Sequence, residues 1–141
     1  MVIDMKKLIN TSFVYALLAM ACGVFYREFT KYNGVSGGTS LAFLHGHLCV
    51  LGTIAFLIIA LLEKQFVLSG TRLFSAFYIT YNIGLFITAA AFLWRGILEV
   101  LGTPISRSLD ASVSGVAGIG HILLGTGIVI LFIRLNKCFT K

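Results

Sequence analysis

Charged residues are scarce in this chain of 141 residues, where aspartate, glutamate, lysine and arginine together make up only 11%. Soluble domains usually carry about a quarter charged residues. With 58% hydrophobic residues, a water-soluble fold of this length could not hide its apolar surface. The composition therefore excludes an ordinary soluble domain and indicates a membrane protein.

The signatures of several functional classes are also missing. The sequence contains no glycine-rich phosphate loop, no cysteines spaced for a metal and no carboxylate inside an apolar run. Cys22 and Cys49 lie within apolar runs and Cys138 lies in the tail, so we expect reduced cysteines rather than disulfides. The net charge of +6 is spread in ones and twos along the chain, which argues against a nucleic-acid partner.

Four long intervals without charge are what the sequence does contain. A helix needs roughly 20 apolar residues to cross the hydrocarbon core, and within lipid it satisfies its own backbone hydrogen bonds. We predict one all-α domain over residues 1–141, a four-helix transmembrane bundle with antiparallel, up-down neighbours. The predicted helices are 9–26, 41–62, 74–94 and 112–133. A pair four residues apart, Arg95 and Glu99, suggests that the third helix continues about one turn further.

The basic residues predict the orientation of this bundle. Seven of them belong to the N-terminus, the second connection and the C-terminus, against four in the first and third connections. Because lysine and arginine are enriched on the cytoplasmic side of membrane proteins, we expect both termini in the cytoplasm.

All three histidines, His45, His47 and His121, fall inside predicted spans. Ionisable groups within a membrane are costly and commonly mark a functional site, although a neutral histidine can also simply join two helices. Counted from the outer helix ends, His45 and His47 lie roughly 7 to 10 Å deep and His121 roughly 13 Å deep. Imidazoles from the second and fourth helices should therefore share one layer, where they could grip a flat macrocycle or bind iron, copper or zinc.

Helical geometry separates His45 from His47, because residues two apart point about 200° apart. His45 shares its face with Gly52, which would let a neighbouring helix approach closely. We therefore expect His45 to face the bundle and His47 to face lipid or a second subunit. Gly118 and the other small residues around His121 could simply favour tight packing or leave room for a planar cofactor. Ala89, Ala90 and Ala91 would line the same layer, and Arg27 and Arg95 could pair with haem carboxylates or serve only as flanking charges.

Several sequence blocks resemble an uncharacterised family of small four-span membrane proteins from Gram-positive bacteria. These blocks are FYREFTK at 25–31, HGHLCVLG at 45–52, YNIGL at 81–85, RGI at 95–97 and GIGHILL at 118–124. This resemblance implies the same topology and a place in the bacterial plasma membrane, but it brings no activity. The pattern His-x-His-Leu-x-x-Leu-Gly alone is similar to segments of proteins related to haem-copper oxidases and of a haem- and copper-containing family linked to nitric oxide.

Together these patterns favour a membrane protein that binds one haem, of the b type, near the outer leaflet. The ligands would be His121 and a histidine of the second helix. Copper is the alternative metal. The competing hypothesis is a non-enzymatic component without a cofactor, such as a small transporter or an accessory subunit, whose histidines hold helices together. The lipid bilayer is the expected partner, and a homodimer or a larger membrane complex is left open.

The predicted orientation can be measured with reporters. A reporter fused after Lys141 and one inserted between residues 63 and 72 should both report the cytoplasm, because the basic residues concentrate there. Cysteines introduced between Gly34 and Gly38 should react with an impermeant reagent added outside. Labelling of the C-terminus from outside would show that the orientation is reversed.

Overall fold

The computed structural model describes residues 3–139, which form helices joined by short connections and contain no strand. Three helices are continuous: α1 (Met5–Tyr32), α4 (Arg72–Val100) and α5 (Arg107–Phe139). The remaining membrane-length helix, Leu41–Phe66, changes its winding along its course. It comprises α2 (Leu41–His47), the π-helix η1 (Leu48–Ile54) and α3 (Ala55–Phe66).

Within residues 3–139, four helices are long and apolar enough to cross a membrane, as the sequence predicted. They contain 28, 26, 29 and 33 residues. At 1.5 Å per residue they are about 40 to 50 Å long and exceed the hydrocarbon thickness of about 30 Å. Each helix contains its predicted range and runs beyond it, because end residues too polar for the apolar core still remain helical. The side chain of Asp4, for example, accepts a hydrogen bond from the Lys7 N–H (2.8 Å) and caps the start of α1.

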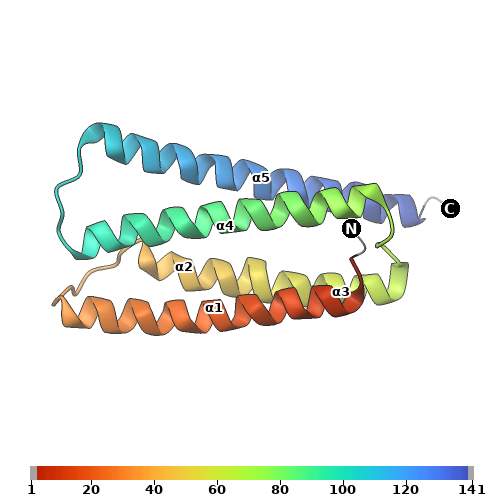
Figure 1. Ribbon diagram of the computed structural model, residues 1–141, viewed down its shortest axis with the longest axis horizontal. Coiled ribbons are helices and arrows are strands. Elements are labelled where there is room, and N and C mark those ends of the chain that lie inside the picture. Colours follow the sequence, from red (N-terminus) through yellow and green to blue (C-terminus); the bar gives the residue numbers. More distant parts are fainter. Residues whose placement is uncertain (1–2, 140–141) are drawn as a thin grey trace.

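The helices form an antiparallel bundle in which α4 lies between α5 and the helix that contains α2 and α3 (Figure 1). On one side α4 packs along α5, and on the other it contacts α2 and η1, which together with α3 pack against α1. Both ends of the described chain lie at the same end of the molecule, as an even number of spans requires (Figure 1).

Glycines at the helix contacts allow this close approach. A methyl group at Gly84 of α4 would lie 2.6 Å from the backbone nitrogen of Leu124 and 2.9 Å from the carbonyl oxygen of Gly120, both on α5. Similarly, a methyl group at Gly96 would lie 2.5 Å from the backbone nitrogen of Leu41 at the start of α2. Since lipid is as apolar as the side chains, helices in membranes associate largely through such backbone contacts.

The π-helix η1 is stabilised by hydroxyl groups from both neighbouring helices. Ser12 of α1 donates a hydrogen bond to the Thr53 carbonyl oxygen (2.8 Å), and Tyr81 of α4 donates one to the Leu51 carbonyl oxygen (2.9 Å). Wider winding changes the helix's own hydrogen bonding, and in lipid each backbone group needs a partner inside the protein. The two hydroxyl groups supply such partners and hold η1 between α1 and α4.

The end of the molecule that carries the termini is closed by contacts around the connection between α3 and α4. The buried Glu63 carboxylate accepts hydrogen bonds from the Ser69 N–H (2.8 Å) and the Ser69 hydroxyl. From α5, Arg134 donates to the carbonyl oxygens of Leu68 (3.0 Å) and Val67 (2.9 Å). The contacts of Arg134 hold the C-terminal end of α5 against the connection between α3 and α4.

The glycine contact between α4 and α5 can be tested with two alanine substitutions. Gly84→Ala should lower the free energy of unfolding by about 1 to 3 kcal/mol, because its new methyl group would meet backbone atoms that cannot turn aside. Gly118→Ala on α5 is the matched control, since nothing lies within 4 Å of its added methyl group. It should leave stability unchanged or raise it slightly, as alanine favours helix. Thermal unfolding in mild detergent would measure both, and equal losses would contradict the assigned contact.

Candidate functional site

His47 and His121 come together although they belong to helices far apart in the sequence. The centroids of their rings are 6.2 Å apart, and the ring planes are nearly perpendicular, at 84°. His47 is half-buried on α2, and His121 is exposed on α5. The prediction that histidines of the second and fourth predicted helices share one layer is therefore confirmed for His47 and His121.

Both rings are held by the carbonyl oxygen one turn before them. The Nδ1 atom of His47 lies 2.9 Å from the Phe43 carbonyl oxygen, and Nδ1 of His121 lies 2.7 Å from the Ala117 carbonyl oxygen. Because a carbonyl oxygen can only accept, each Nδ1 carries the hydrogen of its bond. In the neutral ring, Nε2 then keeps its lone pair, the state in which histidine binds a metal.

Phe92 of α4 packs against both imidazoles. Its ring centroid lies 4.7 Å from that of His47 and 6.2 Å from that of His121, with steep angles of 61° and 87° between the planes. Edge-to-face contacts of this kind are favourable for aromatic rings. Phe92 therefore forms the apolar wall that limits how far either histidine can turn.

Two polar contacts from the end of α4 set the positions of the histidine-bearing helices. The Glu99 carboxylate accepts hydrogen bonds from the N–H (2.6 Å) and the hydroxyl (2.8 Å) of Ser40, the residue before α2. Arg95 donates to the Ser114 hydroxyl (2.8 Å) and pairs with the Asp110 carboxylate, both on α5.

The histidines occupy the same place relative to these two anchors. His47 follows Ser40 by seven residues, and His121 follows Ser114 by seven residues. Seven residues are nearly two helical turns, so each histidine lies on the face of its serine and about 10 Å further along the helix. α4 thereby aligns both helices and brings the two imidazoles to one depth.

The sequence-based expectation that His45 faces the bundle and His47 faces away is wrong. His45 is exposed, and its neighbour is Gly23 of α1. A methyl group added at Gly23 would lie 3.8 Å from the His45 Cβ atom. Gly52 also serves a close contact as expected, but its neighbour is Tyr15 of α1. His45 and Gly52 do share a face that meets another helix, but that helix is α1, and the histidine that meets His121 is His47.

The other predicted site residues lie in different places. Arg95 of α4 reaches the face of α5 that carries His121, where it binds Ser114 and Asp110 rather than Glu99, four residues further along its own helix. Gly118 lies one turn from His121 with open space beside it. Arg27 lies near the end of α1 with a side chain that is 79% exposed, and it pairs with Glu28 at 3.7 Å. The structure does not bring Arg27 to the histidine pair.

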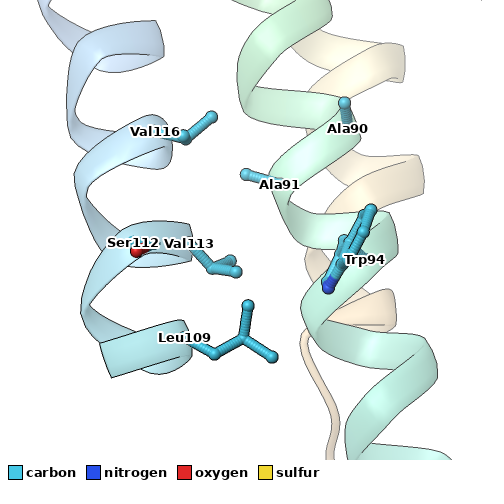
Figure 2. Close-up of a pocket in the computed structure, with 7 residues that line it drawn as sticks. All are labelled: Ala90, Ala91, Trp94, Leu109, Ser112, Val113 and Val116. Atoms are coloured by element: carbon cyan, nitrogen blue, oxygen red, sulfur yellow. The ribbon is translucent and has the colours of Figure 1, made fainter. Parts of the chain in front are cut away.

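A separate cavity of about 250 Å³ opens between α4 and α5 near their connection (Figure 2). Ala90, Ala91 and Trp94 line it from α4, and four residues of α5 complete it: Leu109, Ser112, Val113 and Val116. Its wall is almost entirely apolar, and no histidine belongs to it. The predicted layer of small residues is thus divided, because Ala90 and Ala91 line this cavity whereas Ala89 packs against the cluster around α2.

Among residues 3–139, no three histidine, cysteine, aspartate or glutamate side chains are grouped so that they could hold a metal ion. Structural zinc sites generally need four protein ligands and catalytic ones three. The histidine pair alone does not make either kind of site.

Comparison with protein families finds a match over residues 5–138, to the family described as "Protein of unknown function (DUF2871)". The chain belongs to this family. Neither the comparison with curated proteins nor that with solved structures finds a match. Membership supports the predicted likeness to an uncharacterised four-span family and assigns no activity.

Several residues of the site in this family member were missed by sequence reasoning. Phe92 was not singled out because one aromatic residue in an apolar helix carries no signal of its own. The seven-residue spacing that links Ser40 to His47 and Ser114 to His121 is visible in the sequence and favours His47 over His45. The matching partners, Glu99 and Arg95, could only be assigned once the helices were placed.

Cross-linking can test which face of α2 meets α5. In a variant with the native cysteines replaced by alanine, we expect His47→Cys and His121→Cys to be joined efficiently by a short thiol-to-thiol reagent. Their side chains face each other, with ring centroids 6.2 Å apart. His45→Cys combined with His121→Cys is the matched control and should react only at background level, because His45 faces α1. A protease site inserted between residues 101 and 106 would reveal the link as two fragments that stay joined. Stronger linking of the control pair would refute the assigned rotation.

Proposed function

We propose that this membrane protein binds one haem, of the b type, with His47 and His121 as its two axial ligands. The observation that carries the proposal is the facing pair of imidazoles, each with its Nδ1 hydrogen bound to a backbone carbonyl oxygen and its Nε2 lone pair left for a metal. The site would lie in the half of the membrane nearest the connections 33–40 and 101–106. In the predicted orientation, this is the outer leaflet.

The separation of the rings supports an axial pair. Metal–imidazole bonds are about 2.0 to 2.1 Å long, so two imidazoles on opposite sides of one ion have centroids about 6 Å apart. The centroids of His47 and His121 are 6.2 Å apart. The angle of 84° between the ring planes would not prevent both histidines from holding one metal, because two imidazoles on opposite sides of an ion need not be coplanar.

The number of protein ligands favours haem over a bare metal ion. A porphyrin supplies four equatorial nitrogens and needs only axial ligands from the protein, whereas zinc or copper sites usually take three or four side chains. Among the described residues, no third histidine, cysteine or carboxylate joins the pair. The open space at Gly118 and Gly125, one turn to either side of His121, also suits a flat group lying against α5.

An axial pair would define the role of the site. A haem held by both His47 and His121 would supply electron transfer rather than chemistry on a bound substrate. The protein's own part is to hold the two rings at one depth through Ser40 and Ser114 and to surround them with apolar side chains such as Phe92. Such apolar surroundings would favour whichever redox state of the haem carries the lower charge.

Absorption spectroscopy tests the proposal directly. Purified in mild detergent from haem-replete cells, the protein should show a Soret band corresponding to about one haem per chain. His121→Ala and His47→Ala should each remove most of that band, whereas the matched control His45→Ala should retain it, since His45 faces α1. Circular dichroism would verify that all variants keep their helices.

Two outcomes would overturn the haem assignment. A colourless preparation that also fails to bind added haemin would leave the histidines as groups that join helices in a non-enzymatic component. A colourless preparation that retains copper, and loses it in both His47→Ala and His121→Ala, would favour the copper alternative.

A further inference from the structure

A second candidate site lies where side chains of α1 and α4 meet. A cavity of about 360 Å³ there is lined by two helical stripes. Tyr78, Asn82 and Phe86 of α4 form one stripe, and the other is formed by residues of α1: Lys7, Asn10, Thr11, Val14, Tyr15 and Leu18. None of the residues of the histidine site belongs to it.

The floor of this cavity is polar and internally satisfied. The hydroxyl groups of Thr11 and Tyr78 share a hydrogen bond of 2.6 Å, and Tyr15 donates to the Asn82 side-chain oxygen at 2.8 Å. The Asn82 amide in turn donates to the Tyr78 carbonyl oxygen at 2.7 Å. These bridges join α1 to α4 and fix the shape of the cavity, so a ligand would not have to break them to enter.

Polarity changes along the length of the cavity. The end of the cavity nearest the start of α1 is polar. The Lys7 ammonium group lies there, 5.3 Å from the centroid of the Tyr78 ring, together with the exposed Asn10. Towards the middle of the membrane the lining becomes apolar, with Val14, Leu18 and Phe86. From Lys7 to Leu18 the helix rises by about 16 Å, close to the thickness of one hydrocarbon leaflet. A charged end followed by an apolar length matches a phospholipid.

The sign of the charge selects the kind of headgroup. The ends of α1, α3, α4 and α5 at this end of the molecule carry six basic residues: Lys6, Lys7, Lys64, Arg72, Arg134 and Lys137. Its two acidic residues are engaged within the protein, since Asp4 caps α1 and Glu63 binds Ser69. A headgroup with a net negative charge is therefore favoured over a zwitterionic one.

We propose that the cavity between α1 and α4 binds one anionic phospholipid from the leaflet at the end of the molecule that carries the termini. Its phosphate lies at Lys7 and Asn10, and an acyl chain lies along Val14, Leu18 and Phe86. The site is independent of haem binding.

Native mass spectrometry of the full-length protein provides the test, with phosphatidylglycerol and phosphatidylcholine of equal chain length offered at equal concentration. One phosphatidylglycerol should be retained in preference to phosphatidylcholine. Lys7→Gln should reduce its retention about fivefold, because a basic residue near an anionic headgroup contributes about 1 kcal/mol. The matched control is Lys6→Gln, which changes the adjacent, exposed lysine outside the cavity and should have a much smaller effect.

Two further measurements separate the contribution of the acyl chains from that of the phosphate. Leu18→Trp should fill the apolar part of the cavity and reduce retention of phosphatidylglycerol while leaving Lys7 in place. Glycerol 3-phosphate, which has the phosphate without acyl chains, should not displace the bound lipid. Equal retention of the two lipids, equal effects of Lys6→Gln and Lys7→Gln, or displacement by glycerol 3-phosphate would each overturn the proposal.

Discussion

Contact between helix backbones is the constraint on which the rest of this structure depends. In lipid, apolar side chains gain little by leaving one apolar environment for another, so helices must gain their stability from close packing and from hydrogen bonds. Gly84 and Gly96 provide this packing on opposite sides of α4, towards α5 and towards the start of α2. Larger side chains at these two positions would separate the helices that carry His47 and His121.

The histidine pair is therefore a product of α4, which contributes neither histidine. Its end binds Ser40 through Glu99 and Ser114 through Arg95, and its Phe92 packs against both imidazoles. A site assembled in this way depends on three helices at once. The lining of the cavity at Lys7 and Tyr78 follows the same principle, since hydrogen bonds between α1 and α4 shape it.

The fold could be predicted because intervals without charge report directly on membrane-spanning helices, and all four were found. The site could be predicted only in part. Depth along a helix follows from counting residues, and it correctly placed a histidine of the second predicted helix level with His121. Rotation about the helix axis depends on which neighbour occupies each face. The sequence showed that Gly52 makes a close contact but not that the contact is with Tyr15 of α1, and the choice of His45 failed for this reason.

The π-helix has a consequence for how the second membrane-length helix can present its two halves. An α-helix advances by 100° per residue, so the direction of one side chain fixes the direction of every other. Wider winding over Leu48–Ile54 introduces an angular offset between α2 and α3. The histidine end consequently faces α5 at an angle that an unbroken α-helix would not give it while Phe56 and Ile59 pack in the core at the other end. Within one continuous helix, η1 thus changes the angle between the side chains of α2 and those of α3.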